Sequence, residues 1–501
     1  MIGTIMAVLD SSIVNVALPP MSGTLGATIE QITWVVTGYI LANVIIMPLV
    51  ALLSQRFGRK NFYMVSVLLF TGASMACGLA RSLPVMVAFR AVQGIGGGVL
   101  MTVSQAILRE TFPPEEQGTA MGIFGLGVVL APAFGPTLGG WITDSYSWPW
   151  IFYINVPIGI INLLMVSRFV DDPPYLVRRK GDLDLIGVGL MITGLGALQL
   201  MLEEGERNDW FQSGYIVRLL IIGIVGLVAW VWRELTAEHP AVDLRILKNV
   251  SFTSATALGG VLGMALMGSL FLLPVFLQNL LGYPALKSGI ALMPRSLAMA
   301  VIMPIGGRFY NKLGPRVLVG TGLAVSGFSF WDLSHLTLQV GYWDLFWPQV
   351  FQGIGFSLIF VALSTAALAS IPKPQVTAAT GLYNLSRNIF GSIGIAICAT
   401  QLSAGTSRYH SMLADKINSA NAAAVSWIQS ATAAMMARTG ADVETARAMA
   451  MRMLDGTLMR QAAVLSYNRV FVLVSLLFVI ALPLVFLLKR THADEIELMV
   501  D

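Results

Sequence analysis

The chain consists mainly of long apolar runs separated by short polar breaks. A helix needs about 20 apolar residues to cross roughly 30 Å of hydrocarbon, and fourteen runs of about this length can be marked in the sequence. The runs cover residues 2–21, 33–54, 62–81, 83–108, 117–141, 149–169, 184–203, 214–233, 252–276, 289–307, 316–335, 344–370, 377–403 and 467–488. We therefore predict an all-α membrane protein with fourteen spans.

Composition supports this class and excludes others. Only 12% of the 501 residues are charged, whereas soluble domains carry about 25%. So little charge cannot cover a water-exposed surface, which excludes an ordinary soluble enzyme. The net charge of +4 is too small to indicate a nucleic-acid partner. Cys77 and Cys398 lie in apolar runs and favour neither a disulfide nor a metal site.

Basic residues gather in alternate loops, as the positive-inside rule predicts for loops in the cytoplasm. If the N-terminus is inside, the inner loops contain Arg56, Arg59, Lys60, Arg109, Arg168, Arg178, Arg179, Lys180, Arg233, Arg245, Lys248, Arg308, Lys312, Arg316, Lys373, Lys489 and Arg490. The short outer loops contain Arg81, Arg207 and Lys287. We therefore expect both termini in the cytoplasm. The first run starts almost at Met1, so we expect a cytoplasmic leader that is missing or very short.

Three short motifs recur in the same order later in the chain. Arg56-Phe57-Gly58-Arg59-Lys60 returns as Lys312-Leu313-Gly314-Pro315-Arg316, Gln93-Gly94-Ile95-Gly96 as Gln352-Gly353-Ile354-Gly355, and Ala120-Met121-Gly122 loosely as Ala379-Thr380-Gly381. The first pair is 256 residues apart and the other two pairs are 259 residues apart. We therefore expect two six-helix bundles, in residues 1–170 and 251–501, with two inserted spans in residues 171–250. Parallel halves of this kind place a substrate cavity between them.

Few charged residues lie inside the predicted spans, where an ionised side chain costs roughly 2.5 to 3.5 kcal/mol. They are Asp10 in the first span, Arg90 in the fourth, Arg295 in the tenth and Arg387 in the thirteenth. We predict that Asp10 carries a proton, because a buried carboxyl beside a cation can change its charge near neutral pH. Arg90 is its expected partner. The alternative is a permanent ion pair that fixes helix packing, and for Arg295 and Arg387 snorkelling or helix–helix bonding is favoured.

The fifth span combines glycines with two prolines. Small residues let helix backbones approach each other, and a proline inside a helix bends it. We predict a bent, closely packed helix that acts as a hinge or seal between the halves, against the alternative of generic packing. The residues concerned are Gly127, Pro132, Gly135, Pro136, Gly139 and Gly140.

The loop that contains Arg56, Gly58, Arg59 and Lys60 is short and basic. Its charges alone would only mark the cytoplasmic side. Its recurrence with the central glycine favours a second interpretation, a cytoplasmic gate loop that pairs with acidic groups in one conformation. Both interpretations stay open.

Residues 405–466 form a long outer segment that is rich in Ala, Ser and Met. Thr439-Gly440 followed by Asp442 predicts a helix end and a new N-cap. We expect two amphipathic helices outside the membrane, which either cover the protein's own outer face or dock an external partner.

At these residues the sequence resembles the fourteen-span drug:proton antiporters of the major facilitator superfamily, specifically the EmrB type. The matching segments are Leu9 through Pro19 in span 1, Arg90, Gln93, Gly94 and Gly98 in span 4, Gly127 through Gly140 in span 5, and Ile151 through Gly159. The resemblance implies proton-coupled export of drugs or toxic amphipathic compounds across the bacterial inner membrane, without a cofactor. It implies that Asp10 and Arg90 belong to the coupling machinery, and Asn15, Gln93 and Arg387 are further candidates for the cavity or the coupling.

The resemblance also implies two partners, a periplasmic membrane-fusion adaptor and an outer-membrane channel. One loop departs from the family pattern, since Ala51 and Gln55 stand after span 2 where a Gly and an Asp are usual. This departure argues against a gate loop that depends on that Asp.

Two other functions are left open by the residues. The protein could export one endogenous metabolite, siderophore or fatty acid, which the motifs do not distinguish from drug export. A membrane-embedded enzyme has the least support, because the four histidines, at positions 239, 335, 410 and 492, are not clustered at metal-ligand spacing.

Overall fold

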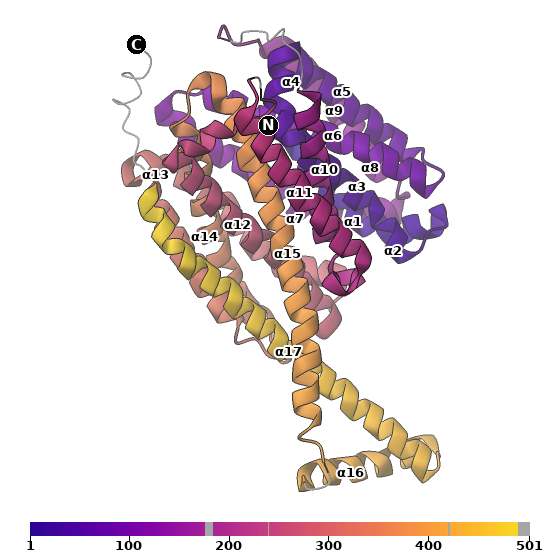
Figure 1. The fold of residues 1–501 in the computed structure, drawn as a ribbon. Coiled ribbons are helices and arrows are strands. Elements are labelled where there is room, and N and C mark those ends of the chain that lie inside the picture. The colour runs from indigo at the N-terminus through magenta and orange to yellow at the C-terminus, as the bar shows by residue number, and fades with distance from the viewer. Residues whose placement is uncertain (176–183, 239, 419–420, 489–501) are drawn as a thin grey trace.

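The computed structural model describes residues 1–175, 184–238, 240–418 and 421–488, and this part of the chain contains helices and no strands. The first group of helices packs together in the indigo and purple part of Figure 1 and is termed the N-terminal half. It consists of α1 (Ile2–Leu25), α2 (Ile29–Ile32), α3 (Trp34–Ile46), α4 (Val50–Phe57), α5 (Arg59–Gly78), α6 (Leu83–Thr111), α7 (Pro114–Ser145), α8 (Trp150–Tyr153) and α9 (Asn155–Phe169).

A second group of helices forms the C-terminal half, and a pair of helices lies between the two groups in the chain. The pair is α10 (Leu185–Glu204) and α11 (Gly214–Thr236), and α10 contacts both α3 and α15. The C-terminal half consists of α12 (Val250–Val275), α13 (Ala285–Leu333), α14 (Tyr342–Ala369), α15 (Val376–Ala414), α16 (Ala422–Thr439) and α17 (Val443–Ala481). The inserted pair therefore bridges the two halves.

The helices of the described residues are long enough to cross a membrane many times. Twelve of them are sufficiently long and apolar, or thirteen if the two parts of α7, which is bent by 40° between Pro132 and Phe134, form one span. The count differs from fourteen because α13 is one element of 49 residues that includes both runs predicted at 289–307 and 316–335. Of the predicted inner basic residues, Lys489, Arg490 and those at 178–180 lie outside the described residues.

Two glycines of the recurring basic motif interrupt the helices in the same way. Gly58 lies between α4 and α5 with φ 83° and ψ 143°, and Gly314 lies inside α13 with φ 76° and ψ 166°. A positive φ favours glycine, which has no Cβ to clash with the backbone. The motif therefore recurs because it forms the same break between consecutive helices in each half.

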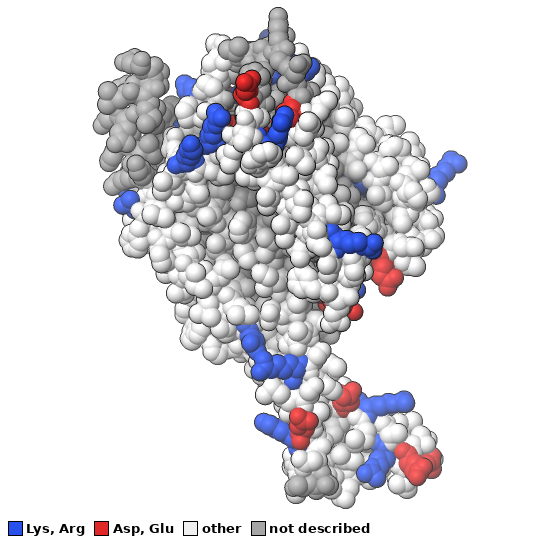
Figure 2. All heavy atoms as spheres, viewed as in Figure 1, with Lys and Arg blue, Asp and Glu red and all other residues white. Residues whose placement is uncertain are grey.

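The surface has the charge distribution of a membrane protein. In Figure 2 the visible flank of the body is mostly uncharged, and charged side chains gather at its upper end and on the segment that protrudes below. Apolar side chains such as Leu164 and Val225 are exposed, as a lipid-facing surface allows. The end of the body that carries Arg59 and Glu110 is termed the Arg59 end, and the opposite one is the protruding end.

The segment of residues 405–466 projects from the body, with α15 and α17 extending outward and α16 at their far ends (Figure 1). Gly440 follows α16 with φ 68°, and Asp442 caps α17 by accepting hydrogen bonds from the backbone N–H groups of Glu444 and Thr445. Hydrogen bonds from Thr445 also lower the pKa of Asp442. The predicted helix end and N-cap are confirmed. The segment does not lie on the outer face, because α15 and α17 continue outward from the body as unbroken helices.

Candidate functional site

Asp10 and Arg90 form a buried ion pair inside the N-terminal half. Arg90 Nη1 lies 2.5 Å from Asp10 Oδ2, and both side chains are fully buried. Asp10 comes from α1 and Arg90 from α6, two helices that pack against each other. The contact predicted between the two residues is therefore present.

Neutral polar side chains surround the carboxylate of Asp10. Gln93 Nε2 and Asn155 Nδ2 each donate to Asp10 Oδ1 at 2.8 Å. Arg90 Nη1 also donates to Gln93 Oε1 at 2.7 Å, and Asn155 Nδ2 lies 3.0 Å from Ser74 Oγ. Gln93 was predicted as a candidate. The sequence indicated Asn155 only as part of a motif and did not indicate Ser74. Polar side chains in apolar helices often form hydrogen bonds between helices, which is the signal that could have identified both residues.

The guanidinium of Arg90 is also held by α3. Its Nε donates to the carbonyl oxygen of Val35 at 3.0 Å, and its Cζ lies 4.3 Å from the centre of the Tyr39 ring. Tyr39 in turn donates to the carbonyl oxygen of Ala7 on α1 at 3.2 Å. Because arginine stays protonated in proteins, the network places a permanent cation against the carboxyl group of Asp10.

A related cluster occupies the corresponding place in the C-terminal half. Arg295 of α13 donates from Nη1 to Ser269 Oγ of α12 at 2.8 Å, and Ser269 Oγ donates to Gln352 Oε1 of α14 at 3.2 Å. Arg295 is 4% exposed and Gln349, one turn before Gln352, is fully buried. Arg295 therefore bonds to a neighbouring helix, as the favoured interpretation predicts.

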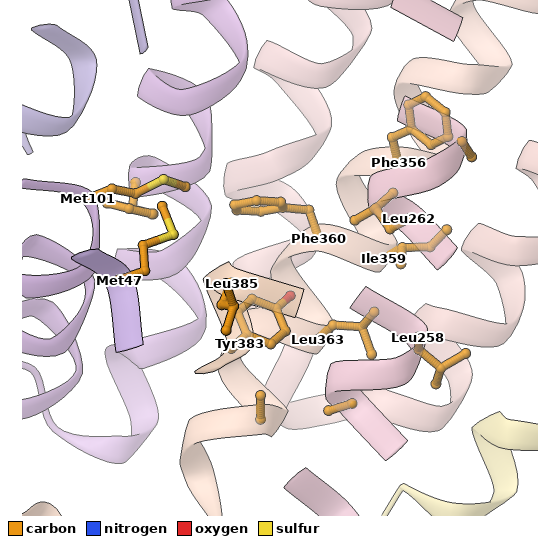
Figure 3. Packing of buried hydrophobic residues seen from close by; sticks show 14 of the residues in the cluster. Met47, Met101, Leu258, Leu262, Phe356, Ile359, Phe360, Leu363, Tyr383 and Leu385 are labelled. Carbon is orange, nitrogen blue, oxygen red and sulfur yellow. The ribbon is translucent and has the colours of Figure 1, made fainter. Parts of the chain in front are cut away.

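The other two polar candidates lie elsewhere. Arg387 is partly buried between the halves, where its Cζ lies 5.3 Å from the centre of the Phe360 ring and its Nη2 lies 3.8 Å from Met101 Sδ. Figure 3 shows Met101 and Met47 of the N-terminal half opposite Phe360 and Leu385 of the C-terminal half. Asn15 is exposed and contacts the backbone of its own helix, so it is not part of the Asp10 network.

The glycines of the fifth span pack within the N-terminal half. A Cβ on Gly135 would lie 1.9 Å from Ser12 Oγ, and a Cβ on Gly139 would lie 2.7 Å from Ile13 Cγ1, both on α1. Gly127 similarly approaches Ile5, while Gly140 has looser surroundings. The helix is bent between Pro132 and Phe134, and Pro136 lies inside its second part. The contact with the other half is made by an earlier part of α7, because the face with Gly135 and Gly139 turns toward α1.

The two halves are in close contact near the Arg59 end. A Cβ on Gly118 of α7 would lie 2.4 Å from the carbonyl oxygen of Gly307 on α13. Asn384 Nδ2 donates to Gln105 Oε1 at 3.0 Å, and Arg109 Nε donates to the carbonyl oxygen of Leu368 at 3.3 Å. These contacts close the space between the halves at this end.

The predicted gate loop contributes to the same closure. Arg59 is buried, forms an ion pair with Glu110, and donates from Nη2 to Thr377 Oγ1 of the other half at 3.3 Å. Lys60 Nζ lies 3.3 Å from the exposed Asp171 carboxylate. Arg56 is exposed and Gly58 provides the break described above. The loop therefore pairs with acidic groups other than the Asp that Gln55 replaces.

Comparison with known proteins identifies the family. The sequence model of the family described as the Major Facilitator Superfamily matches residues 1–395. The chain belongs to this superfamily. Among curated relatives of this superfamily, the fatty acid resistance protein FarB of Neisseria gonorrhoeae is 35% identical over 488 residues, covering 97% of this chain and 94% of FarB. The multidrug export protein EmrB of Escherichia coli (strain K12) is 36% identical over 421 residues, covering 84% of this chain and 82% of EmrB.

Solved structures of the major facilitator superfamily share the fold. The proton:xylose symporter XylE aligns with a TM-score of 0.58 at 13% identity, covering 95% of this chain and 92% of XylE. The human organic anion transporter MFSD10 also aligns with a TM-score of 0.58, at 14% identity, covering 95% of this chain and 97% of MFSD10. The family and fold are therefore those of transporters.

Proposed function

We propose that the protein exports drugs or other toxic amphipathic compounds across the bacterial inner membrane in exchange for protons. The observation that carries the proposal is the Asp10 network, in which a fully buried carboxylate contacts Arg90, Gln93 and Asn155. A buried ionisable group in a membrane helix marks a proton or ion pathway by default. No cofactor is needed, since the proton gradient supplies the energy.

Protonation of Asp10 would change how α1 is held. The charged carboxylate accepts a charge-assisted hydrogen bond from Arg90, which is stronger than a neutral one. When Asp10 takes up a proton, this bond weakens and Arg90 loses its counter-ion. Because α1 also packs on α7 through Ser12 and Gly135, a change at Asp10 reaches the helix that contacts the other half.

The proposed transport cycle uses the predicted topology, in which the chain crosses the membrane fourteen times and both termini lie in the cytoplasm. In this topology α13 comprises two spans joined at Gly314, and the Arg59 end faces the cytoplasm. The contacts of Gly118 with Gly307 and of Arg59 with Thr377 then seal the cytoplasmic side. Rocking of the two halves would open this side and close the other, which is alternating access.

The descriptions of the relatives support the substrate class. EmrB of Escherichia coli is a multidrug export protein by its description, and a relative from Acinetobacter baumannii, 32% identical, is described as a colistin resistance protein.

We propose that the protruding segment, which carries exposed side chains such as Met451 and Met453, binds a periplasmic adaptor that leads to an outer-membrane channel. Exposed apolar side chains on a segment that projects from the body are available for contact with a protein partner.

A single endogenous substrate class is the second candidate, and one observation favours it. FarB, described as a fatty acid resistance protein, covers nearly the whole chain. On this alternative the protein exports fatty acids in preference to cationic drugs.

Transport assays in proteoliposomes test the proton-coupled function. We expect that a pH gradient drives uptake of a fluorescent dye by the wild-type protein, and that Asp10→Asn reduces the driven rate at least tenfold. The reason is that the amide of Asn cannot bind or release the proton. Dye binding to the purified variant shows that its fold is intact. Asp144→Asn removes an exposed carboxylate of α7 as a control and should transport normally. Equal driven rates for Asp10→Asn and wild type would exclude Asp10 as the proton carrier.

A further inference from the structure

Among the residues that the structure describes, the polar cluster of the C-terminal half contains a buried cation and no carboxylate. Arg295 Nη1 donates to the neutral hydroxyl of Ser269, which donates to Gln352. The ion pairs found among the described residues do not include Arg295. A buried charge without a counter-ion is costly, and in proteins it is normally paired.

The internal repeat shows what is missing from this cluster. Asp10, Arg90 and Gln93 of the N-terminal half correspond, 259 residues later, to Ser269, Gln349 and Gln352. The glutamine next to the glycine is retained, while the carboxylate is replaced by a hydroxyl. The cation comes from a different helix, because Arg295 belongs to α13. The C-terminal cluster therefore resembles the N-terminal network with its carboxylate removed.

The cluster also has unused hydrogen-bonding groups. Gln352 Nε2 and both polar atoms of the Gln349 side chain are buried without a hydrogen-bond partner. Buried polar groups are nearly always paired in native proteins, so such a group needs an explanation. The amide N–H groups and the guanidinium are donors, and a carboxylate has about four acceptor positions for them.

We propose that this cluster binds the carboxylate of an anionic amphipathic substrate, with Arg295 as the cation that recognises it. In the N-terminal half, the carboxylate of Asp10 accepts bonds from an arginine and a glutamine. The substrate's carboxylate would accept the same pair of bonds from Arg295 and Gln352, and Gln349 would supply a third. The proposal rests on the proposed export function and names one class of substrate for it.

The same stretch of α13 offers an apolar surface for the rest of such a molecule. Pro294 and Ala298, which lie within one helical turn of Arg295, line a groove of about 450 Å³ between α13 and α14, and the buried Arg295 is not among the described residues that line it. Phe346 and Val350 line its other side, and the lining is almost entirely apolar. A molecule with one carboxylate and an apolar body therefore matches the chemistry of both surfaces.

Equilibrium binding to the purified protein in detergent tests the proposal. The probes are a long-chain fatty acid and the alcohol of the same chain length, so that the two ligands differ in the carboxylate alone. We expect the wild-type protein to bind the acid at least tenfold more tightly than the alcohol. Arg295→Gln should remove this preference and leave the affinity for the alcohol unchanged. Arg295→Lys should restore part of it.

Two further variants keep the test decisive. Ser269→Asp supplies a carboxylate inside the cluster and should abolish the preference by occupying Arg295. Arg460→Gln removes a cation of the protruding segment that contacts the Leu280 carbonyl, and it should keep the preference. Equal weakening of acid and alcohol by Arg295→Gln, or no preference in the wild type, would overturn the proposal. Because binding is measured without a gradient, failure of proton coupling is distinguished from failure of this site.

Discussion

The two halves of the molecule contain polar clusters at corresponding positions, but in the part of the chain that the structure describes only one cluster contains its own negative charge. In the N-terminal half the guanidinium of Arg90 lies against the carboxylate of Asp10. In the C-terminal half Arg295 lies against the hydroxyl of Ser269. Gln93 and Gln352 occupy the same place in both clusters, 259 residues apart.

The difference assigns different tasks to the two halves. A carboxylate that belongs to the protein can gain and lose a proton, which suits coupling to a gradient. A buried cation that has no carboxylate from the protein beside it is suited to a ligand that has a carboxylate. Under our two proposals, the duplicated scaffold therefore holds the proton site in one half and a substrate site in the other.

The largest expected effect comes from giving the N-terminal cluster the residues of the C-terminal one. Asp10→Ser leaves Arg90 buried without a counter-ion, which should cost about 3 to 5 kcal/mol of stability. The double variant Asp10→Ser/Arg90→Gln removes both charges and should recover most of this loss. Arg90→Gln alone should cost less than Asp10→Ser, because Asp10 can take up a proton while arginine cannot lose one.

Thermal unfolding of the purified variants measures this difference. If the double variant is as unstable as Asp10→Ser, the loss comes from packing around α1, and the electrostatic distinction between the two halves fails.

Much of the fold could be predicted from the sequence, because apolar runs of membrane-spanning length and alternating basic loops are local properties. In α13 the two predicted runs meet at Gly314, where the backbone is non-helical, as the recurring basic motif indicates. Asp10, Arg90 and Gln93 were predicted because charge and motif mark them. Asn155 and Ser74 were not, because a neutral polar residue in an apolar helix looks like packing until helix rotation shows which side chains meet.

The C-terminal cluster shows a second reason for incomplete prediction. The repeat identifies Gln352 as the counterpart of Gln93, but Arg295 has no counterpart in the Asp10 network. Its meaning depends on the contact with Ser269, which joins residues of two different helices. The face that the glycines of α7 present was likewise not predictable, since spacing alone does not tell which helix packs there.

The next largest effect concerns the closure between the two halves at the Arg59 end. Gly118→Val places side-chain atoms where the Cβ alone would lie 2.4 Å from the backbone oxygen of Gly307. The halves must then separate there, and we expect a longer distance between spin labels at the exposed positions Glu116 and Leu313. Gly320→Val is the control, because its Cβ would meet Val485 only at 4.0 Å. An unchanged distance in Gly118→Val would show that this contact does not hold the two halves together.

The smallest effect is expected at the protruding end, where the inserted pair of helices connects the two halves. Between α10 and α11, Arg207 donates to Thr33 Oγ1 of the N-terminal half at 2.7 Å, and Trp210 Nε1 donates to Thr400 Oγ1 of the C-terminal half at 2.8 Å. Trp210→Phe keeps an aromatic ring and removes one hydrogen bond, worth about 0.5 to 1.5 kcal/mol.

That energy changes an equilibrium between conformations by roughly tenfold at most. Spin labels at the exposed positions Glu30 and Arg408 should therefore show a modest shift toward longer distances in Trp210→Phe. Trp232→Phe, at an exposed position of α11, should leave the distances unchanged. If the distance between the labels is also unchanged in Trp210→Phe, the hydrogen bond of Trp210 does not hold the two halves together at this end. The difference between the halves is then confined to their buried clusters.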